Sequence, residues 1–396
     1  MSSINFMEKL LDGVEVEWKT LGQTCKIETG KLNANAAVDD GEYMFFTTAK
    51  ETSKIDKFRW DTEALLIAGN ANVGEVKHYI GKFEAYQRTY VLTNFDENVS
   101  VRFLYFVLSH SLKKYLEERT NSAAMTYIVL STLENFPIPI PCPENPKKSL
   151  EIQAEIVRIL DAFTELTAEL TAELTARKKQ YNYYRGRLLS FEEGEVEWKT
   201  LGEIGDVKMC KRILKNETQP SGDVPFYKIG TFGKKADAFI SSEVYESYRD
   251  RYSFPKKGDV LISAAGTIGR AVVYDGEPAY FQDSNIVWLD NDESIVTNRY
   301  LWHFYKIAKW FVSSGGTIDR LYNDNIRKTT IPVPYPNNPE KSLAEQARIV
   351  AILDKFDALT NSITEGLPRE ISLRQKQYAH YRDLLLSFPK QAEVTG

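Results

Sequence analysis

Cysteine is scarce in this chain. Its 396 residues include three cysteines, Cys25, Cys142 and Cys210, which are far apart and form no CxxC pair. Neither a zinc site nor a disulfide framework is therefore indicated. The sequence also lacks any apolar run of about 18 residues, the length that a membrane helix needs, and its first residues lack the apolar core of a signal peptide. These absences predict a reduced, cytoplasmic protein.

Motifs for nucleotide, cofactor and methyl-transfer chemistry are missing as well. There is no G-x-x-x-x-G-K-[ST] loop and no G-x-G-x-x-G after a strand. The Asn-Pro-Pro-aromatic loop that holds a target base in amino-methyltransferases is absent too. The four histidines, His78, His110, His303 and His380, stand alone in the sequence. We therefore expect no catalytic residue, no metal ligand and no cofactor bound by this chain.

One triplet keeps an enzymatic alternative open. Glu17 and Lys19, and again Glu197 and Lys199, form E-x-K, which is half of a metal-dependent nuclease signature. That chemistry also needs an upstream acid, usually after a proline, to hold Mg²⁺. No proline here is followed by aspartate. The other interpretation is that the tryptophan inside each triplet anchors a strand.

What the sequence has in abundance is internal repetition, which is the first feature to look for in a long chain. VEWKTLG at residues 16–22 returns at 196–202, 180 positions later. The proline-rich I-P-x-P connector at Ile138 returns at Ile331, 193 positions later. The pattern Q-Y-x-x-Y-R at Gln180 returns at Gln377, 197 positions later. The repeats are near-identical at their boundaries and weaker between them.

Each repeat consists of a variable block, a connector and a long helix. We predict a first globular domain at 1–147, a first conserved helix at 148–194, a second globular domain at 195–340, and a second helix with a tail at 341–396. Ser149 and Ser342 are the candidate N-caps of the two helices. A chain of this length is too large for one ordinary core. The fold class is therefore mixed α+β, with two globular domains separated by two long antiparallel helices that pack as a coiled coil.

Within the blocks, short β-rich runs alternate with amphipathic segments. We expect strands at 64–68, 89–93, 259–263, 271–274 and 285–289, and helices near 101–118 and 298–311. In the first long helix, Leu166 ends Thr-Glu-Leu, and Leu170 and Leu174 end two Thr-Ala-Glu-Leu repeats, so the three leucines lie four residues apart. Each step of four drifts by roughly 40°, which predicts a broad apolar stripe. Pro368 should kink or break the second long helix.

The net charge of −5 shows no overall basic character, so any nucleic-acid contact must be local. Glycine-containing loops at 68–74 and 264–270, followed by turns at 86–89 and 281–284, occupy matching places in the two blocks. Two basic clusters lie at 208–215 and 248–257, and aromatic residues are interleaved in the second of them. The alternatives are tight turns and ordinary solvated surface. The candidate DNA-binding residues are Asn70, Asn72, Lys77, Arg88, Lys211, Arg212, Arg251, Thr267, Arg270 and Gln282.

The carboxyl ends of both long helices are rich in tyrosine, whose large amphipathic ring is favoured at protein interfaces. We expect these ends to bind partner subunits as well as each other. The candidate interface residues are Tyr181, Tyr184, Leu188, Tyr378, Tyr381 and Leu385.

Taken together, these motifs resemble the specificity (S) subunit of type I restriction–modification systems, over essentially the whole chain. The residues that carry the resemblance are the entries Trp18–Gly22 and Trp198–Gly202, the two connectors, and S-L-x-x-Q-x-x-I-V-x-I-L-D after each connector. The helix ends Q-Y-x-x-Y-R-x-x-L-L-S-F and the Thr-Ala-Glu-Leu tandem add to it.

The resemblance implies that each block is a target-recognition domain reading one half of a bipartite, asymmetric site in double-stranded DNA. It implies that the helices set the spacer and bind two methyltransferase subunits. S-adenosylmethionine would belong to those subunits, and ATP and Mg²⁺ to two further restriction subunits. Two alternatives remain: a single-chain nuclease that uses Glu17 and Lys19, and a coiled-coil scaffold with no DNA role.

Overall fold

The computed structural model describes residue 10 and residues 14–119, 127–192, 196–312 and 320–389. The chain divides into two compact units. Unit 1 comprises Met1–Thr171 and Glu370–Gly396, and unit 2 comprises Ala172–Arg369. Both division points fall inside the predicted long helices. Each unit therefore combines one variable block with a segment from each helical region.

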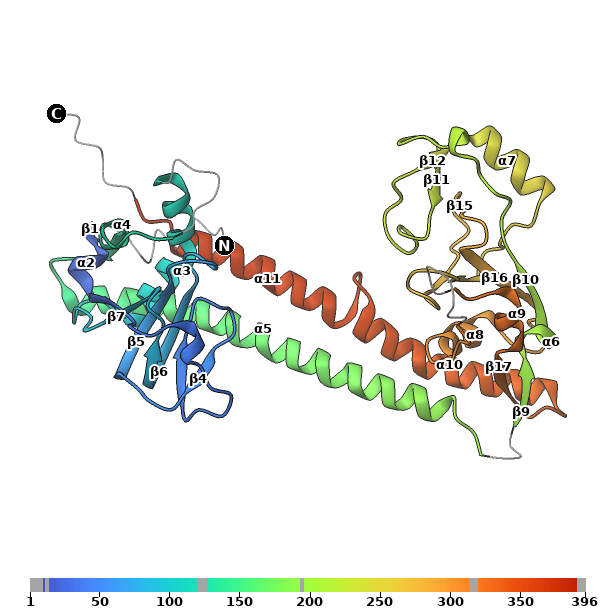
Figure 1. Ribbon diagram of the computed structural model, residues 1–396, viewed down its shortest axis with the longest axis horizontal. Helices are drawn as coiled ribbons and strands as arrows, with labels where there is room; N and C mark the ends of the chain where they lie inside the picture. Colours follow the sequence, from blue (N-terminus) through green and yellow to red (C-terminus); the bar gives the residue numbers. More distant parts are fainter. Residues whose placement is uncertain (1–9, 11–13, 120–126, 193–195, 313–319, 390–396) are drawn as a thin grey trace. The chain divides into compact units, whose positions relative to one another are not determined.

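The block of unit 1 is a mixed sheet with a helix on one face (Figure 1). Its six-stranded sheet has the order β2-β7-β5-β6-β3-β4, in which only the β3–β6 pairing is parallel. Its elements are β1 (Val16–Thr20), α2 (Leu21–Thr24), β2 (Lys26–Thr29), η1 (Ala34–Ala36), β3 (Tyr43–Phe46), β4 (Ser53–Ile55), β5 (Trp60–Ala68), β6 (Val76–Ala85), β7 (Thr89–Thr93), α3 (Val101–Arg119), α4 (Leu130–Glu134) and β8 (Pro137–Pro141).

Strand β5 is central because apolar side chains cover both of its faces. Leu65 and Ile67 join the large core under α3. Ala64 and Leu66 point the other way, into a smaller core. A strand that is buried on both faces has a continuous apolar sequence, and this run predicted the strand at 64–68.

The block of unit 2 splits its strands between two main sheets, of order β10-β16-β13-β14 and β12-β11-β15. Alternate residues of β13 and β16 face two different apolar clusters, one under α8 and one toward α7. Its elements are β9 (Val196–Thr200), α6 (Leu201–Ile204), β10 (Gly205–Lys208), η2 (Lys215–Glu217), β11 (Val224–Tyr227), β12 (Phe239–Ile240), α7 (Ser242–Arg251), β13 (Val260–Ser263), β14 (Ala271–Val273), β15 (Tyr280–Phe281), β16 (Ile286–Asn291), α8 (Asn298–Tyr305), α9 (Asn323–Lys328) and β17 (Thr330–Pro334).

The repeated sequence motifs form the same two-stranded ribbon in each unit. β1 pairs antiparallel with β8, and β9 pairs antiparallel with β17. The I-P-x-P connector is thus a strand, and its prolines are tolerated because a two-stranded ribbon leaves each strand a free edge. Trp18 packs on the core of unit 1 and donates its indole N–H to the Pro389 carbonyl at 3.0 Å. Trp198 is instead 55% exposed, so the expectation that it anchors its strand is wrong.

The first long helix, α5, runs without interruption over Pro146–Leu188. The second helical region is two helices, α10 (Pro339–Asn361) and α11 (Gly366–Leu385). The predicted break is confirmed, and Pro368 lies in the first turn of α11, where its missing N–H costs nothing. Gly366 takes φ +73, and a Cβ there would lie 2.4 Å from the Ala358 carbonyl oxygen.

The predicted N-caps are wrong by one turn. Asn145 and Asn338 cap the helices, accepting from the backbone N–H of Lys148 at 3.1 Å and Lys341 at 3.0 Å. The Asn-Pro sequence supplies both a capping side chain and a proline suited to the first helical position. The serines expected to cap are buried one turn later, at 1% and 4% exposure.

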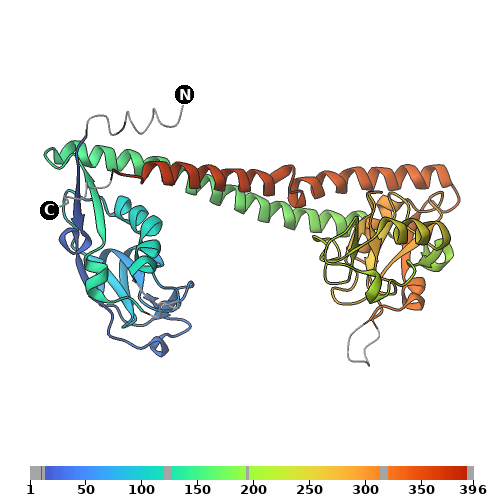
Figure 2. The same cartoon turned by 90° about the horizontal axis from the view of Figure 1, so that it is seen from above.

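Within each unit, segments of the two helical regions lie side by side in opposite directions (Figures 1 and 2). In unit 1, Phe163 of α5 stacks on Tyr381 of α11. In unit 2, Tyr181 and Tyr184 of α5 stack on Phe356 of α10. The antiparallel packing that the repeat predicted is therefore present in each unit.

Candidate nucleic-acid interface

The turn between β6 and β7 presents one arginine from a fixed frame. The Gln87 N–H donates to the Leu32 carbonyl at 2.9 Å, and the buried Thr89 hydroxyl donates to the Phe46 carbonyl at 3.1 Å. Arg88 lies between these two anchored residues and is exposed. It lines a cavity of about 270 Å³ together with Tyr127, whose side chain is 55% exposed. A rigid turn of this kind removes the entropic cost of ordering the backbone when Arg88 binds a ligand.

The matching turn after β15 in unit 2 has a different residue at the same position. The Gln282 N–H donates to the Tyr227 carbonyl at 2.9 Å, and its side-chain oxygen accepts from the Ile229 N–H at 2.9 Å. Asp283 follows, and its carboxylate accepts from Nε of Arg212 at 2.9 Å. The two blocks therefore share a turn and differ in the charge at its tip.

In and beside the glycine-containing loops, several candidate side chains are already bonded within the protein. Asn72 donates to the Thr48 carbonyl at 2.7 Å, and Lys77 donates to the carbonyls of Ala49 and Lys50 at 2.8 and 2.7 Å. Arg270 donates to the Phe232 carbonyl at 2.9 Å. These bonds hold the loops in shape, so these three side chains contribute first to local structure.

The remaining candidates differ in how freely they can reach a ligand. The side-chain oxygen of Asn70 is buried and has no bonding partner among the described residues. Thr267 is exposed at the tip of its loop. Lys211 is exposed and its ammonium lies 5.2 Å from the Tyr252 ring centroid, while Arg251 donates to the Ser247 carbonyl at 3.2 Å.

At the helix ends, the candidate interface residues divide into buried and accessible ones. Tyr181 is 3% exposed and donates its hydroxyl to Asp357 at 3.2 Å, and burial raises the pKa of that phenol. Leu385 is fully buried in the core of unit 1. Tyr184 and Tyr381 remain 39% and 36% exposed. A partner could therefore reach the last two but not the first two.

The other predicted helix positions are half-buried. Leu188 and Tyr378 pack at the edges of their units' cores. The three spacer leucines also share this intermediate exposure, which agrees with a broad apolar stripe. They are Leu166, Leu170 and Leu174.

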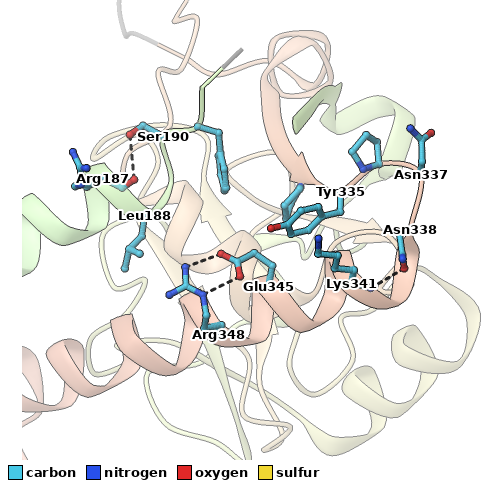
Figure 3. A pocket seen from close by; sticks show the side chains of 12 residues that line it. Arg187, Leu188, Ser190, Tyr335, Asn337, Asn338, Lys341, Glu345 and Arg348 are labelled. Atoms are coloured by element: carbon cyan, nitrogen blue, oxygen red, sulfur yellow. Dashed lines mark hydrogen bonds and ion pairs between the residues drawn. The ribbon is translucent and has the colours of Figure 1, made fainter. Parts of the chain in front are cut away.

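A cavity of about 590 Å³ lies in unit 2, between the end of α5 and the start of α10 (Figure 3). Arg348 makes a bidentate pair with Glu345, at 2.8 and 2.7 Å. The Lys341 ammonium lies 3.8 Å from the Tyr335 ring centroid, and Arg187 of α5 also lines the cavity. No sequence pattern indicated this cavity, because its lining comes from segments about 150 residues apart.

Two further contacts fix each block to its helix and were not predicted: a buried glutamine and an Arg–Asp ion pair. Gln153 of α5 and Gln346 of α10 are fully buried and bond the backbone just before the block helices α3 and α8. Arg102 of α3 donates to Asp161 at 3.0 Å, and Arg299 of α8 donates to Asp354 at 2.9 Å. The sequence does carry a sign of these contacts, because each of these polar residues recurs at the repeat spacing among apolar neighbours.

The described residues contain no cluster of three or more histidine, cysteine, aspartate or glutamate side chains arranged to hold a metal ion. In the E-x-K triplet of unit 2, Glu197 pairs with Lys199 at 2.8 Å. Within the same described ranges, none of the helices combines the length and apolarity needed to cross a bilayer.

Two divergent blocks, each fixed to antiparallel helices and each presenting a rigid polar turn, define a recognition protein. The family model described as the type I restriction modification DNA specificity domain matches residues 13–177 and 193–373. The chain belongs to this family and is a non-catalytic DNA-specificity subunit. Such a subunit acts on DNA in an assembly with the other subunits of its system.

Full-length relatives agree with this assignment. A protein described as a type I restriction enzyme specificity subunit of Haemophilus influenzae is 48% identical over 401 residues, covering 97% of this chain and 98% of that relative. The specificity subunit of an Escherichia coli type I restriction enzyme is 37% identical over 420 residues, covering 100% of both chains. The crystal structure of an S subunit from M. genitalium has the same fold, with a TM-score of 0.59 and 18% identity over 96% of this chain and 98% of that chain.

The predicted family and mixed α+β fold class are therefore confirmed, and none of these findings favours the nuclease alternative.

Proposed function

We propose that the two blocks read the two halves of a bipartite, asymmetric DNA site. One observation carries this proposal. The turns at 86–89 and 281–284 occupy equivalent places and are held by equivalent backbone bonds, but their tips carry Arg88 and Asp283. Equal frames with unequal tips are what two related readers of different sequences require, because base identity is read by side chains at groove edges.

The helices in this proposal set the distance between the half-sites and hold two methyltransferase subunits. The exposed rings of Tyr184 and Tyr381 support a partner surface at the helix ends. Two restriction subunits complete the assembly. S-adenosylmethionine, ATP and Mg²⁺ are assigned to these partners, and this chain is expected to bind none of them.

Sequencing the methylated bases of the source cell, with and without this gene, tests the proposal. We expect a bipartite motif with two unlike halves, a fixed spacer and methylated adenines, present only when the gene is intact. A purified complex with the methyltransferase subunits should shift DNA that carries this motif in preference to scrambled DNA. An identical methylation pattern in both strains, or no preference in the shift, would contradict it.

A further inference from the structure

We propose that each block reads one guanine through an arginine: Arg88 at the turn of unit 1, and in unit 2 Arg212, which Asp283 of the matching turn orients. This inference rests on the proposed function and names the side chains that would carry its specificity. The two guanidinium groups come from different segments of the two blocks, so the two guanines are not expected at equivalent positions of the half-sites.

Arg88 is available for a ligand. Among the described residues, no side chain or carbonyl is bonded to its guanidinium, although its carbonyl accepts from the Gly69 N–H at 2.8 Å. The backbone on both sides of it is fixed, and the cavity beside it is open to solvent and flanked by the exposed ring of Tyr127. An unpaired guanidinium on a rigid turn can form two parallel hydrogen bonds with O6 and N7 of guanine in the major groove.

In unit 2, the carboxylate of Asp283 takes the position of Arg88 and holds an arginine from another segment. The Asp283 side chain is 16% exposed, whereas that of Arg212 is 68% exposed. Only Nε of Arg212 is bonded to the carboxylate, at 2.9 Å. The two terminal nitrogens are therefore not bonded to this carboxylate, and they form the edge of the guanidinium that suits a guanine.

Other charged side chains nearby are less suited to base reading. Lys77 and Arg270 donate to main-chain carbonyls at 2.8 and 2.9 Å, respectively. Lys211 adjoins Arg212 and offers a single compact charge on a flexible stem, which suits a phosphate. The turn tips thus single out one arginine in each block.

The test compares methylation motifs in cells that carry the complete system with single variants of this chain. We expect Arg88→Ala to weaken discrimination at one base position of one half-site by about 5- to 150-fold, the usual value of a bidentate contact. The other half-site should be unchanged. Arg88→Lys should lose most of the discrimination too, because it keeps the charge but lacks the fork.

The matching variants of unit 2 are Arg212→Ala and Asp283→Asn. We expect Arg212→Ala to relax one position of the other half-site, and Asp283→Asn to relax that same position to a smaller extent, as suits a positioning residue. Asp283→Glu, which keeps the carboxylate, should retain more of the base preference at that position than Asp283→Asn does. Lys114→Ala, which removes an exposed charge on the surface of α3, is the control and should leave the motif intact.

Three results would overturn the inference. Arg88→Ala and Arg212→Ala could both leave the motif unchanged and fully methylated, or both could relax the same half-site. Alternatively, both could weaken methylation equally at all sites without changing the preferred bases. These failures are distinct from failure of the proposed function. If the proposed function failed, the unaltered chain itself would direct methylation at no bipartite motif.

Discussion

His303 is a buried titratable side chain that the repeat does not share. It lies fully buried on α8 with Nε2 2.7 Å from an Asp354 oxygen, and its Nδ1 has no bonding partner among the described residues. Burial lowers its pKa to about 4, and the nearby cations Lys306 and Arg299 act in the same direction, whereas Asp354 opposes them. At the equivalent place in unit 1, four residues after the paired arginine, stands Phe106.

We expect His303→Phe to remove an acid-sensitive part of the protein's stability. A histidine whose folded pKa is depressed stabilises the fold above its unfolded pKa of about 6.5, and that stability is lost as the pH falls toward 4. The loss amounts to about 3 kcal/mol at most. Urea unfolding at pH 7 and at pH 5 should show a smaller pH difference in the variant than in the unaltered chain. His380→Phe, on an exposed position of α11, is the control, and an unchanged pH difference in His303→Phe would contradict the assignment.

At the scale of elements, each variable block is joined to its long helix by a buried glutamine. Gln153 accepts from the Ser100 N–H at 2.8 Å and donates to the Asn98 carbonyl at 2.9 Å. Gln346 makes the same pair of bonds to the Thr297 N–H at 3.0 Å and the Ile295 carbonyl at 2.8 Å. Each amide thus satisfies both kinds of backbone group just before a block helix begins, where a helix N-terminus leaves N–H groups unpaired.

We expect Gln153→Leu to destabilise unit 1 by about 2–6 kcal/mol, because two buried backbone groups lose their partners at about 1–3 kcal/mol each. Gln346→Leu should do the same in unit 2. Denaturant unfolding measures both. Gln377→Leu, an exposed glutamine of α11, should change the unfolding free energy by less than about 0.5 kcal/mol. Equal effects at the buried and exposed positions would show that these bonds contribute little.

The sequence predicted most of the elements, for local reasons. The strands at 89–93 and 260–263 and the helix at Val101–Arg119 come from short apolar runs and helical spacing, and the structure has them with small shifts at the ends. Helix α8 is shorter than expected and ends at Tyr305. The prediction extended this helix to Phe311, but the Trp310 ring packs beside Tyr305, at 5.3 Å between ring centroids, from outside the helix. Periodicity alone does not distinguish a ring on the helix from one that packs against it from beyond its end.

The two turns of the candidate interface were predictable in position, but the hydrogen bonds of their side chains were not. Alignment of the repeats located both turns, since a repeated turn needs only local sequence. Which side chains are free was not predictable, because the bonds that engage Asn72 and Arg270 reach across 24 and 38 residues of sequence. The Arg212–Asp283 pair spans 71 residues and carries no local signal.

At the scale of the whole molecule, the same set of parts is built twice by different routes along the chain. Unit 2 is continuous in sequence, whereas unit 1 gathers both ends of the chain. The Trp18 indole bonds the Pro389 carbonyl, and Phe388 packs edge-on against Phe103 of the first block. In unit 2 the chain runs directly from the end of α5 to β9. In unit 1 the end of α11 and β1 are joined instead by the non-covalent contact between Trp18 and Pro389. The nearly circular order of block and helix inferred from the repeats agrees with this closure.

The division between the units falls in the Thr-Ala-Glu-Leu repeats of α5, at Thr171 and Ala172. Deleting Thr171–Leu174 removes about 6 Å of helix and turns the remainder by only roughly 40°, so the apolar stripe keeps its face. We expect both half-site sequences to persist in the methylation motif while the spacer shortens by about two base pairs, at about 3.4 Å each.

Deleting only Ala172 and Glu173 is the matched control for helix rotation. It removes half the length but turns the remainder by roughly 200°, which moves Leu174 and the following stripe to the opposite face. That variant should lose methylation at both half-sites, because its apolar positions no longer meet their packing partners. If instead the four-residue deletion left the spacer unchanged, or the two-residue deletion shortened it without loss of methylation, helix length would not set the distance between the half-sites.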